Sequence, residues 1–231
     1  MHMNSLHRIH ISEDTIKIPI NNEFLEGNLN FISKSQKMVV FAHGSGSGRH
    51  SPRNKFVSRI LNECGISTLL VDLLTENEER IDNITAEYRF NIPLLADRLT
   101  LVTQFLVNHQ VHQKHTAKEI GYFGASTGAA AALIAAEKMK NVIKAVVSRG
   151  GRVDLAHTYV STENIVCPIL FIVGENDEPV IRWNKYVLEN QLPNVKHKQI
   201  IIIPGASHLF EEPGKLEEVA KYAAEWFTKH L

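Results

Sequence analysis

The stretch that decides the fold is Gly124-Ala125-Ser126-Thr127-Gly128, which follows the apolar run Glu119–Phe123 and opens the alanine-rich segment Ser126–Met139. A Gly-x-Ser-x-Gly pattern between a strand and a helix is typical of a nucleophile elbow, a tight and strained turn that lifts a serine hydroxyl above a sheet. Glycines two residues before and two residues after the serine leave room for the neighbouring strand and helix. The motif alone is also compatible with a serine that serves as an ordinary helix N-cap.

Short apolar runs alternate with helix-period segments along the rest of the chain. Continuously apolar runs such as Met38–Phe41 predict strands buried on both faces, as in a parallel sheet covered by helices. We therefore expect one α/β domain over residues 1–231, with a mostly parallel eight-stranded sheet, helices on both faces and an antiparallel hairpin at its first edge. The acid-rich segment Thr75–Arg89 predicts a surface loop or a frayed helix. The expected strands are Thr15–Ile20, Leu25–Ile32, Lys37–Ala42, Ser67–Asp72, Glu119–Phe123, Ile143–Ser148, Ile169–Val173 and Lys198–Ile203, and the expected helices are Pro52–Cys64, Ile92–His109, Ser126–Met139, Val180–Gln191 and Lys215–His230.

Composition excludes several classes of protein. The 231 residues carry 25 basic and 25 acidic side chains, and a net charge of zero argues against a nucleic-acid partner. No apolar run reaches the roughly 18 residues of a membrane span, and the first residues have no apolar core of a secretion signal. Two cysteines that are far apart predict neither a disulfide framework nor a structural zinc site. We expect a cytoplasmic protein without a membrane partner.

The order of three polar residues along the chain strengthens the elbow interpretation. Asp177 follows the next-to-last expected strand and His208 follows the last one, so that the order is serine, acid, histidine. That order, with each residue on a loop after a separate strand, is the order of α/β-hydrolases. A serine hydroxyl becomes a good nucleophile when a histidine takes its proton and an acid orients that histidine. Glu175 and Glu178 are alternatives for the acid, and Asp177 is preferred because it lies in a turn before a proline-led helix.

A glycine-rich loop, His43–Pro52, follows an earlier expected strand. Acyl transfer needs two backbone N–H groups that bind the developing oxyanion. The residue after the nucleophile, Thr127, is expected to supply one, and the loop the other, with Ser45 preferred and Gly46 next.

The same loop has a competing interpretation as a phosphate-binding glycine loop. In that case Gly44–Gly48 would cradle a phosphate and Asp72 would bind the ribose of a nucleotide. The spacing fits poorly, because Arg49 stands where the third glycine of a dinucleotide fingerprint belongs and no Gly-Lys-Ser/Thr sequence follows.

Three arginines fall in loops that we expect at the carboxyl edge of the sheet. Arg49, Arg149 and Arg152 form, in one interpretation, a cationic rim that binds a carboxylate or phosphate of the substrate. The alternative, which we favour, is that they pair with local acids and stiffen the loops. The candidate acids are Asp154, Glu175 and Glu178.

Taken together, these motifs resemble a known family over most of the chain. The chain resembles a dienelactone-hydrolase-related α/β-hydrolase, of the small type that is also found fused to phosphoribosyltransferase domains. The resemblance rests on Gly124–Gly128 with the Asp177 and His208 turns, and less specifically on Gly44–Asn54 and Ser148–Ala156. Dienelactone hydrolase itself uses a cysteine nucleophile, whereas this elbow carries Ser126.

The resemblance implies an α/β-hydrolase with a serine–histidine–aspartate triad and an acyl-enzyme intermediate. The expected substrate is a small soluble carboxylic ester, thioester or lactone, neutral or anionic, and no cofactor or metal is implied. Only Arg149–Asn164 separate two of the strands, which is too short for the long lid of many lipases. The alternatives are a nucleotide-binding module that uses Gly44–Gly48 and a catalytically silent protein of the same fold. The sequence does not predict the oligomeric state.

Overall fold

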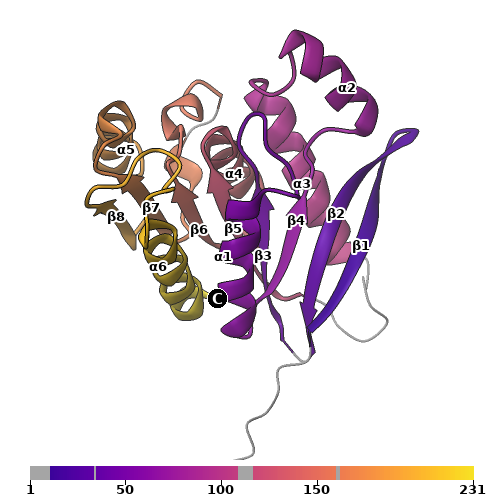
Figure 1. Ribbon diagram of the computed structural model, residues 1–231, viewed down its shortest axis with the longest axis horizontal. Helices are drawn as coiled ribbons and strands as arrows, with labels where there is room; N and C mark the ends of the chain where they lie inside the picture. The colour runs from indigo at the N-terminus through magenta and orange to yellow at the C-terminus, as the bar shows by residue number, and fades with distance from the viewer. Residues whose placement is uncertain (1–10, 34, 109–116, 160–161) are drawn as a thin grey trace, which may run out of the picture.

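The computed structural model describes residues 11–33, 35–108, 117–159 and 162–231, and its centre is one eight-stranded sheet (Figure 1). The strand order is β1-β2-β4-β3-β5-β6-β7-β8; β1 and β2 form an antiparallel hairpin, β2 pairs with β4 in the antiparallel sense, and the remaining pairs are parallel. The mostly parallel sheet and the edge hairpin predicted from the apolar runs are therefore confirmed. The strands are β1 (Ile11–Ile20), β2 (Glu23–Ile32), β3 (Lys37–Ala42), β4 (Ser67–Val71), β5 (Glu119–Ala125), β6 (Ile143–Arg149), β7 (Ile169–Gly174) and β8 (Lys198–Ile203).

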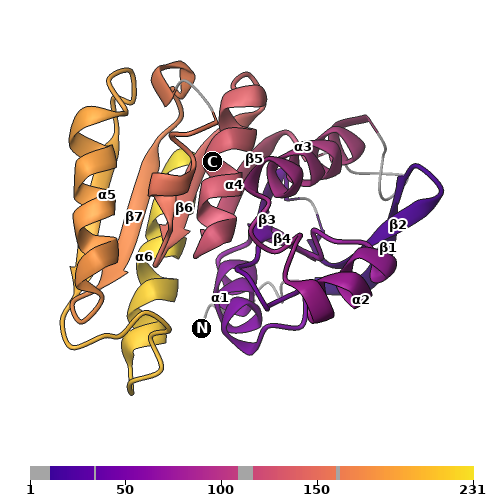
Figure 2. The same ribbon diagram turned by 90° about the horizontal axis from the view of Figure 1, so that it is seen from above.

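Helices cover both faces of the sheet, as Figure 2 shows from above. Buried side chains of α1 and α6 form one apolar core with the sheet, and those of α3, α4 and α5 form the core on the opposite face. The alanines of α4 are almost fully buried, since small side chains let that helix lie close to the strands. Two-sided burial accounts for the continuously apolar central strands. These helices are α1 (Pro52–Glu63), α3 (Ile92–Asn108), α4 (Thr127–Lys138), α5 (Glu178–Asn190) and α6 (Lys215–His230).

A sixth helix, α2 (Glu76–Thr85), occupies the segment in which we expected a loop or a frayed helix. A capping box begins it: the Thr75 side chain accepts the backbone N–H of Glu78, and the Glu78 carboxylate accepts the N–H of Thr75. The helix lies on the β4 and β2 side of the sheet, near the turn of the β1–β2 hairpin (Figure 1).

The connection after β6 is short, as the sequence predicted. It contains two single-turn 3₁₀ helices, η1 (Val153–Leu155) and η2 (Thr162–Asn164), where we expected room for one short helix; residues 160–161 between them lie outside the described part. Among the residues that the structure describes, no helix has the length and apolar character needed to span a membrane.

Candidate active site

Ser126 stands on a strained turn between the end of β5 and the start of α4. Its backbone has φ 50° and ψ −120°, a conformation that a residue other than glycine rarely adopts, and its side chain makes no capping hydrogen bond. The turn is crowded: a Cβ placed on Gly128 would lie 2.2 Å from the carbonyl oxygen of Ala42, and one on Gly124 would lie 2.5 Å from the Cα of Ala129. This geometry matches a nucleophile elbow and differs from an ordinary N-cap.

The turns after β7 and β8 bring Asp177 and His208 together. The Nδ1 atom of His208 lies 2.5 Å from Oδ2 of Asp177, whose side chain is 12% exposed, whereas the histidine side chain is 37% exposed. Asp177 precedes α5 but makes no side-chain capping bond. The two alternative acids are engaged elsewhere, because Glu175 accepts a backbone N–H of the histidine loop and Glu178 pairs with Arg182.

The loop that carries His208 is fastened on two sides. Its Ser207 N–H donates to both carboxylate oxygens of Glu212, at 3.0 and 3.1 Å, and the Ser207 hydroxyl and that N–H lower the pKa of Glu212. Gly150 at the end of β6 lies against the other side, since a Cβ there would lie 3.4 Å from Nδ1 of His208. The adjacent Arg149 carbonyl accepts the N–H of Ser126 at 3.1 Å, so the end of β6 lies between the serine turn and the histidine loop.

The glycine-rich loop after β3 lies against the serine turn. A Cβ on Gly44 would lie 3.1 Å from the Cβ of Ser126. His43, which is 8% exposed, holds the start of this loop: its Nε2 accepts the N–H of Leu73 at 3.0 Å, which leaves the proton on Nδ1 to donate to the carbonyl of Gly44 at 3.0 Å. Sequence reasoning quoted His43 as the head of the loop and assigned it no role.

The two expected oxyanion donors lie next to each other. The Ser45 N–H donates to Oγ1 of Thr127 at 2.9 Å. Ser45 can therefore bind an oxyanion only by sharing this hydrogen bond or by giving it up. Gly46 follows with a φ of 68°, a left-handed conformation that glycine adopts without strain.

Two of the three arginines singled out in the sequence are engaged with carboxylates. The backbone N–H of Arg49 donates to Oδ1 of Asp72 at 2.6 Å, and its guanidinium pairs with Oδ2 of Asp72 and, at 2.6 Å, with Glu26. Arg152 donates two hydrogen bonds to Asp154, at 3.0 and 2.9 Å, and its guanidinium lies 4.3 Å from the ring centre of Trp183. These contacts correspond to the structural alternative for both arginines, with Asp72 and Glu26 as partners that the sequence did not suggest. The third, Arg149, ends strand β6 rather than standing in a loop, and its side chain is buried.

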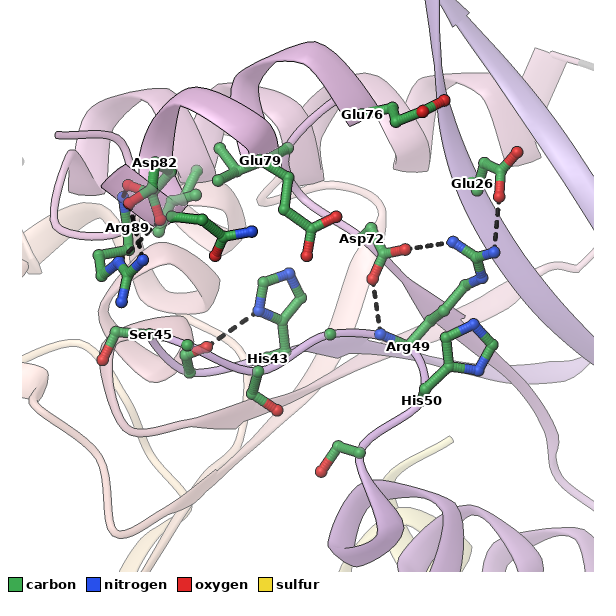
Figure 3. A pocket seen from close by; sticks show the side chains of 18 of the residues that line it. Glu26, His43, Ser45, Arg49, His50, Asp72, Glu76, Glu79, Asp82 and Arg89 are labelled. Carbon is green, nitrogen blue, oxygen red and sulfur yellow. Dashed lines mark hydrogen bonds and ion pairs between the residues drawn. The ribbon is translucent and has the colours of Figure 1, made fainter. Parts of the chain in front are cut away.

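A polar cavity of about 920 Å³ opens beside the loop after β3, with α2 as its outer wall (Figure 3). Asp82 and Arg89 form a clasp on that wall: Asp82 accepts the N–H groups of Tyr88 and Arg89 and the Nε of the Arg89 guanidinium. Burial alone would raise the pKa of Asp82, but these donors lower it below its ordinary value. A Cβ on Gly46 would lie 3.9 Å from Nη1 of Arg89, so the clasp reaches over the loop. No sequence signal pointed to this clasp.

The described residues contain no group of three or more histidine, cysteine, aspartate or glutamate side chains arranged to hold a metal ion.

Comparisons with known proteins show the family and the fold of the chain. Residues 31–230 match the dienelactone hydrolase family. Two Mycobacterium tuberculosis proteins with phosphoribosyl transferase names are 48% identical over 206 residues, which are 89% of this chain and 44% of theirs, so the chain spans less than half their length. A dienelactone hydrolase crystal structure from Anabaena variabilis is 46% identical, with a TM-score of 0.88 over 96% of this chain and 99% of that one. Est1E from Butyrivibrio proteoclasticus, 16% identical with a TM-score of 0.72 over 93% of this chain and 98% of its own, shares the fold. As its resemblance predicted, the chain belongs to the dienelactone hydrolase family and has the α/β-hydrolase fold.

Proposed function

We propose that this protein is a serine hydrolase that cleaves small soluble carboxylic esters, thioesters or lactones. Ser126 is the nucleophile, His208 the general base and Asp177 the acid that orients the histidine. The proposal rests on the strained turn at Ser126 and on the pairing of His208 with Asp177, in which Nδ1 lies 2.5 Å from a carboxylate oxygen. Both features follow strands of the sheet at its carboxyl edge. The family match and the similarity to a dienelactone hydrolase structure support it.

In the first half of the reaction His208 takes the proton of the Ser126 hydroxyl through Nε2, and the serine oxygen bonds to the substrate carbonyl carbon. The carbonyl oxygen becomes an oxyanion, which accepts the Thr127 N–H and an N–H of Ser45 or Gly46. The tetrahedral intermediate then breaks the bond to the leaving group, which takes the proton from His208. The product of this half is an acyl-enzyme.

In the second half a water molecule gives its proton to His208 and attacks the acyl carbon. The bond to Ser126 breaks, the serine oxygen takes the proton back, and the carboxylic acid leaves. Throughout, Asp177 accepts the Nδ1–H of the histidine. This keeps Nε2 free to accept a proton and stabilises the imidazolium that forms.

The cavity supports a small and polar substrate. Its wall beside the loop after β3 contains charged side chains, among them Glu79, Asp82 and Arg89 (Figure 3). A long acyl chain would desolvate the exposed carboxylate of Glu79 without giving it a hydrogen-bond partner, which is unfavourable.

Of the two alternatives, the nucleotide-binding module requires an aspartate that is free to bind ribose. Both oxygens of Asp72 already accept hydrogen bonds from Arg49, so the structural contacts favour the hydrolase. The catalytically silent alternative has the same described contacts and is separated from the hydrolase by reactivity alone.

The test is labelling with a neutral fluorophosphonate, followed by peptide mass spectrometry, together with ester turnover. We expect stoichiometric labelling at Ser126, no labelling of Ser126→Ala, and unchanged labelling of Ser12→Ala, a serine on the edge strand β1. His208→Ala and Asp177→Asn should each reduce kcat by several powers of ten. A folded wild type that neither labels at Ser126 nor hydrolyses any ester in a short-chain and lactone panel would refute the proposal.

A further inference from the structure

The side chain of Arg149 is a buried guanidinium for which the structure supplies no partner. The residue is 7% exposed, and its Nε and Nη1 atoms make no hydrogen bond with any described residue. Every other arginine in the described ranges donates to a carboxylate or an amide oxygen, so this one stands apart. The arginines with such partners are Arg49, Arg53, Arg59, Arg80, Arg89, Arg98, Arg152 and Arg182.

The surroundings of Arg149 are positive rather than negative. Burial, followed by the charge of Arg53 in the first turn of α1, lowers its pKa to about 10, so the guanidinium is still charged at neutral pH. Arg53 itself pairs with Glu211 at 2.7 Å, and no described carboxylate lies within ion-pairing distance of Arg149. A buried charge without a counter-ion is strongly unfavourable, and an anion that reaches it relieves that cost.

Arg149 lies next to the chemistry. Its carbonyl accepts the N–H of Ser126, and the following residue, Gly150, packs against the ring of His208. Alternation along β6 directs its side chain to the α1–α6 face, where Ala145 and Val147 of the same strand are buried. The cavity beside the loop after β3 extends to Arg53, the cation that acts on Arg149.

We propose that Arg149 binds a negatively charged oxygen group of the substrate, a carboxylate or a phosphate, on the α1 side of Ser126. This inference rests on the proposed hydrolase and names its substrate class: esters, thioesters or lactones that carry an anion near the scissile bond. Arg149 is then a specificity residue, and the missing counter-ion arrives with the substrate. Arg49 and Arg152, whose guanidinium groups are already neutralised, do not share this role.

The test uses aryl esters with the same acyl chain, ending in a carboxylate, a phosphate or a neutral carboxamide. We expect the wild type to prefer at least one anionic ester over the carboxamide by about tenfold to a hundredfold in kcat/KM. This ratio corresponds to the free energy of a hydrogen bond to a charged group. Arg149→Met should abolish that ratio, Arg149→Lys should keep part of it, and Arg59→Gln, a charge-matched change on α1, should keep it whole. The carboxylate and phosphate arms identify which anion the site takes. Equal kcat/KM for all three esters, or a preference that survives Arg149→Met, would overturn the inference.

Two further measurements separate this inference from the proposed function. If the fluorophosphonate labels Ser126 while the anion preference is absent, the hydrolase stands and the inference fails. If Ser126 does not label, glutarate and inorganic phosphate are titrated calorimetrically at constant ionic strength: binding that Arg149→Met weakens at least tenfold supports the site, and no binding overturns it.

The thermal stability of the Arg149→Met variant without ligand also tests the inference. Because Arg149→Met removes a buried charge that has no described partner, its Tm without ligand should equal or exceed that of the wild type. A fall of several degrees would assign Arg149 a structural role instead.

Discussion

Replacing His43 by alanine should both destabilise the protein and slow acyl transfer. The ring hydrogen-bonds two buried backbone groups, the N–H of Leu73 and the carbonyl of Gly44, each at 3.0 Å, and the Gly44 carbonyl also accepts the N–H of Ser47 at 3.2 Å. Removing the ring leaves the Leu73 N–H unsatisfied, at about 1–3 kcal/mol, and takes one of two hydrogen bonds from Gly44, at about 1 kcal/mol, so the free energy of unfolding should fall by about 3 kcal/mol. For a domain of this size that corresponds to a fall in Tm of about 6–12 °C. Since Gly44 begins the loop expected to supply an oxyanion donor, kcat should fall by up to about a hundredfold.

Two conservative variants separate the two hydrogen bonds of the ring. His43→Asn places an amide near the position of Nδ1 and can still donate to Gly44, whereas His43→Gln places one near Nε2 and can still accept from Leu73. The glutamine variant should recover more of the lost stability in denaturant unfolding, because it satisfies the Leu73 N–H, and the asparagine variant should recover more of kcat, because it keeps the contact with Gly44. If His43→Ala lost less than about 1 kcal/mol, a single unsatisfied group at most, or if glutamine restored kcat better than asparagine, the assigned role of the ring would be wrong.

Two other predictions concern the turn and the last helix. Gly128→Ala should lower the free energy of unfolding by about 3 kcal/mol or more, because the added Cβ meets backbone at 2.2 Å; denaturant unfolding with wild-type stability would contradict it. Burial, followed by the charges of Lys229 and His197, lowers the pKa of His230 in the folded protein. Below the ordinary histidine pKa the unfolded chain therefore binds more protons than the folded one, and stability decreases as the pH decreases. His230→Phe should flatten this acid-side decline in Tm, and an unchanged slope would show that other groups cause it.

Local patterns were sufficient for most of the framework. The bounds of β3, β8 and α6 agree with the sequence prediction at both ends, because each is a continuous apolar or amphipathic run flanked by turn residues. The pairing of Asp177 with His208 was also foreseeable, since the carboxyl ends of adjacent parallel strands meet at one edge of the sheet.

What sequence reasoning missed depends on contacts between distant segments or on a weak local signal. The Thr75-x-x-Glu78 capping box can be recognised in the sequence. The acid-rich segment after it has so few apolar residues that its pattern did not predict the helix α2. The partners of Arg49 lie 23 residues away on either side, on β2 and after β4, and no spacing rule connects them. Nor does any sequence pattern distinguish an arginine that finds a carboxylate from one, like Arg149, that finds none.

The salt bridge between Arg49 and Glu26 connects the N-terminal hairpin to the glycine-rich loop after β3, which we propose supplies an oxyanion donor. The part of the chain that matches the family starts at residue 31, so Glu26 and all of β1 lie outside it. Trimming the protein to that boundary would remove one of the two carboxylates that hold Arg49, together with residues 27–30 of β2, which pair with β4 in the sheet. Designers of shortened versions or domain fusions should therefore keep the hairpin, even though it carries none of the reacting groups.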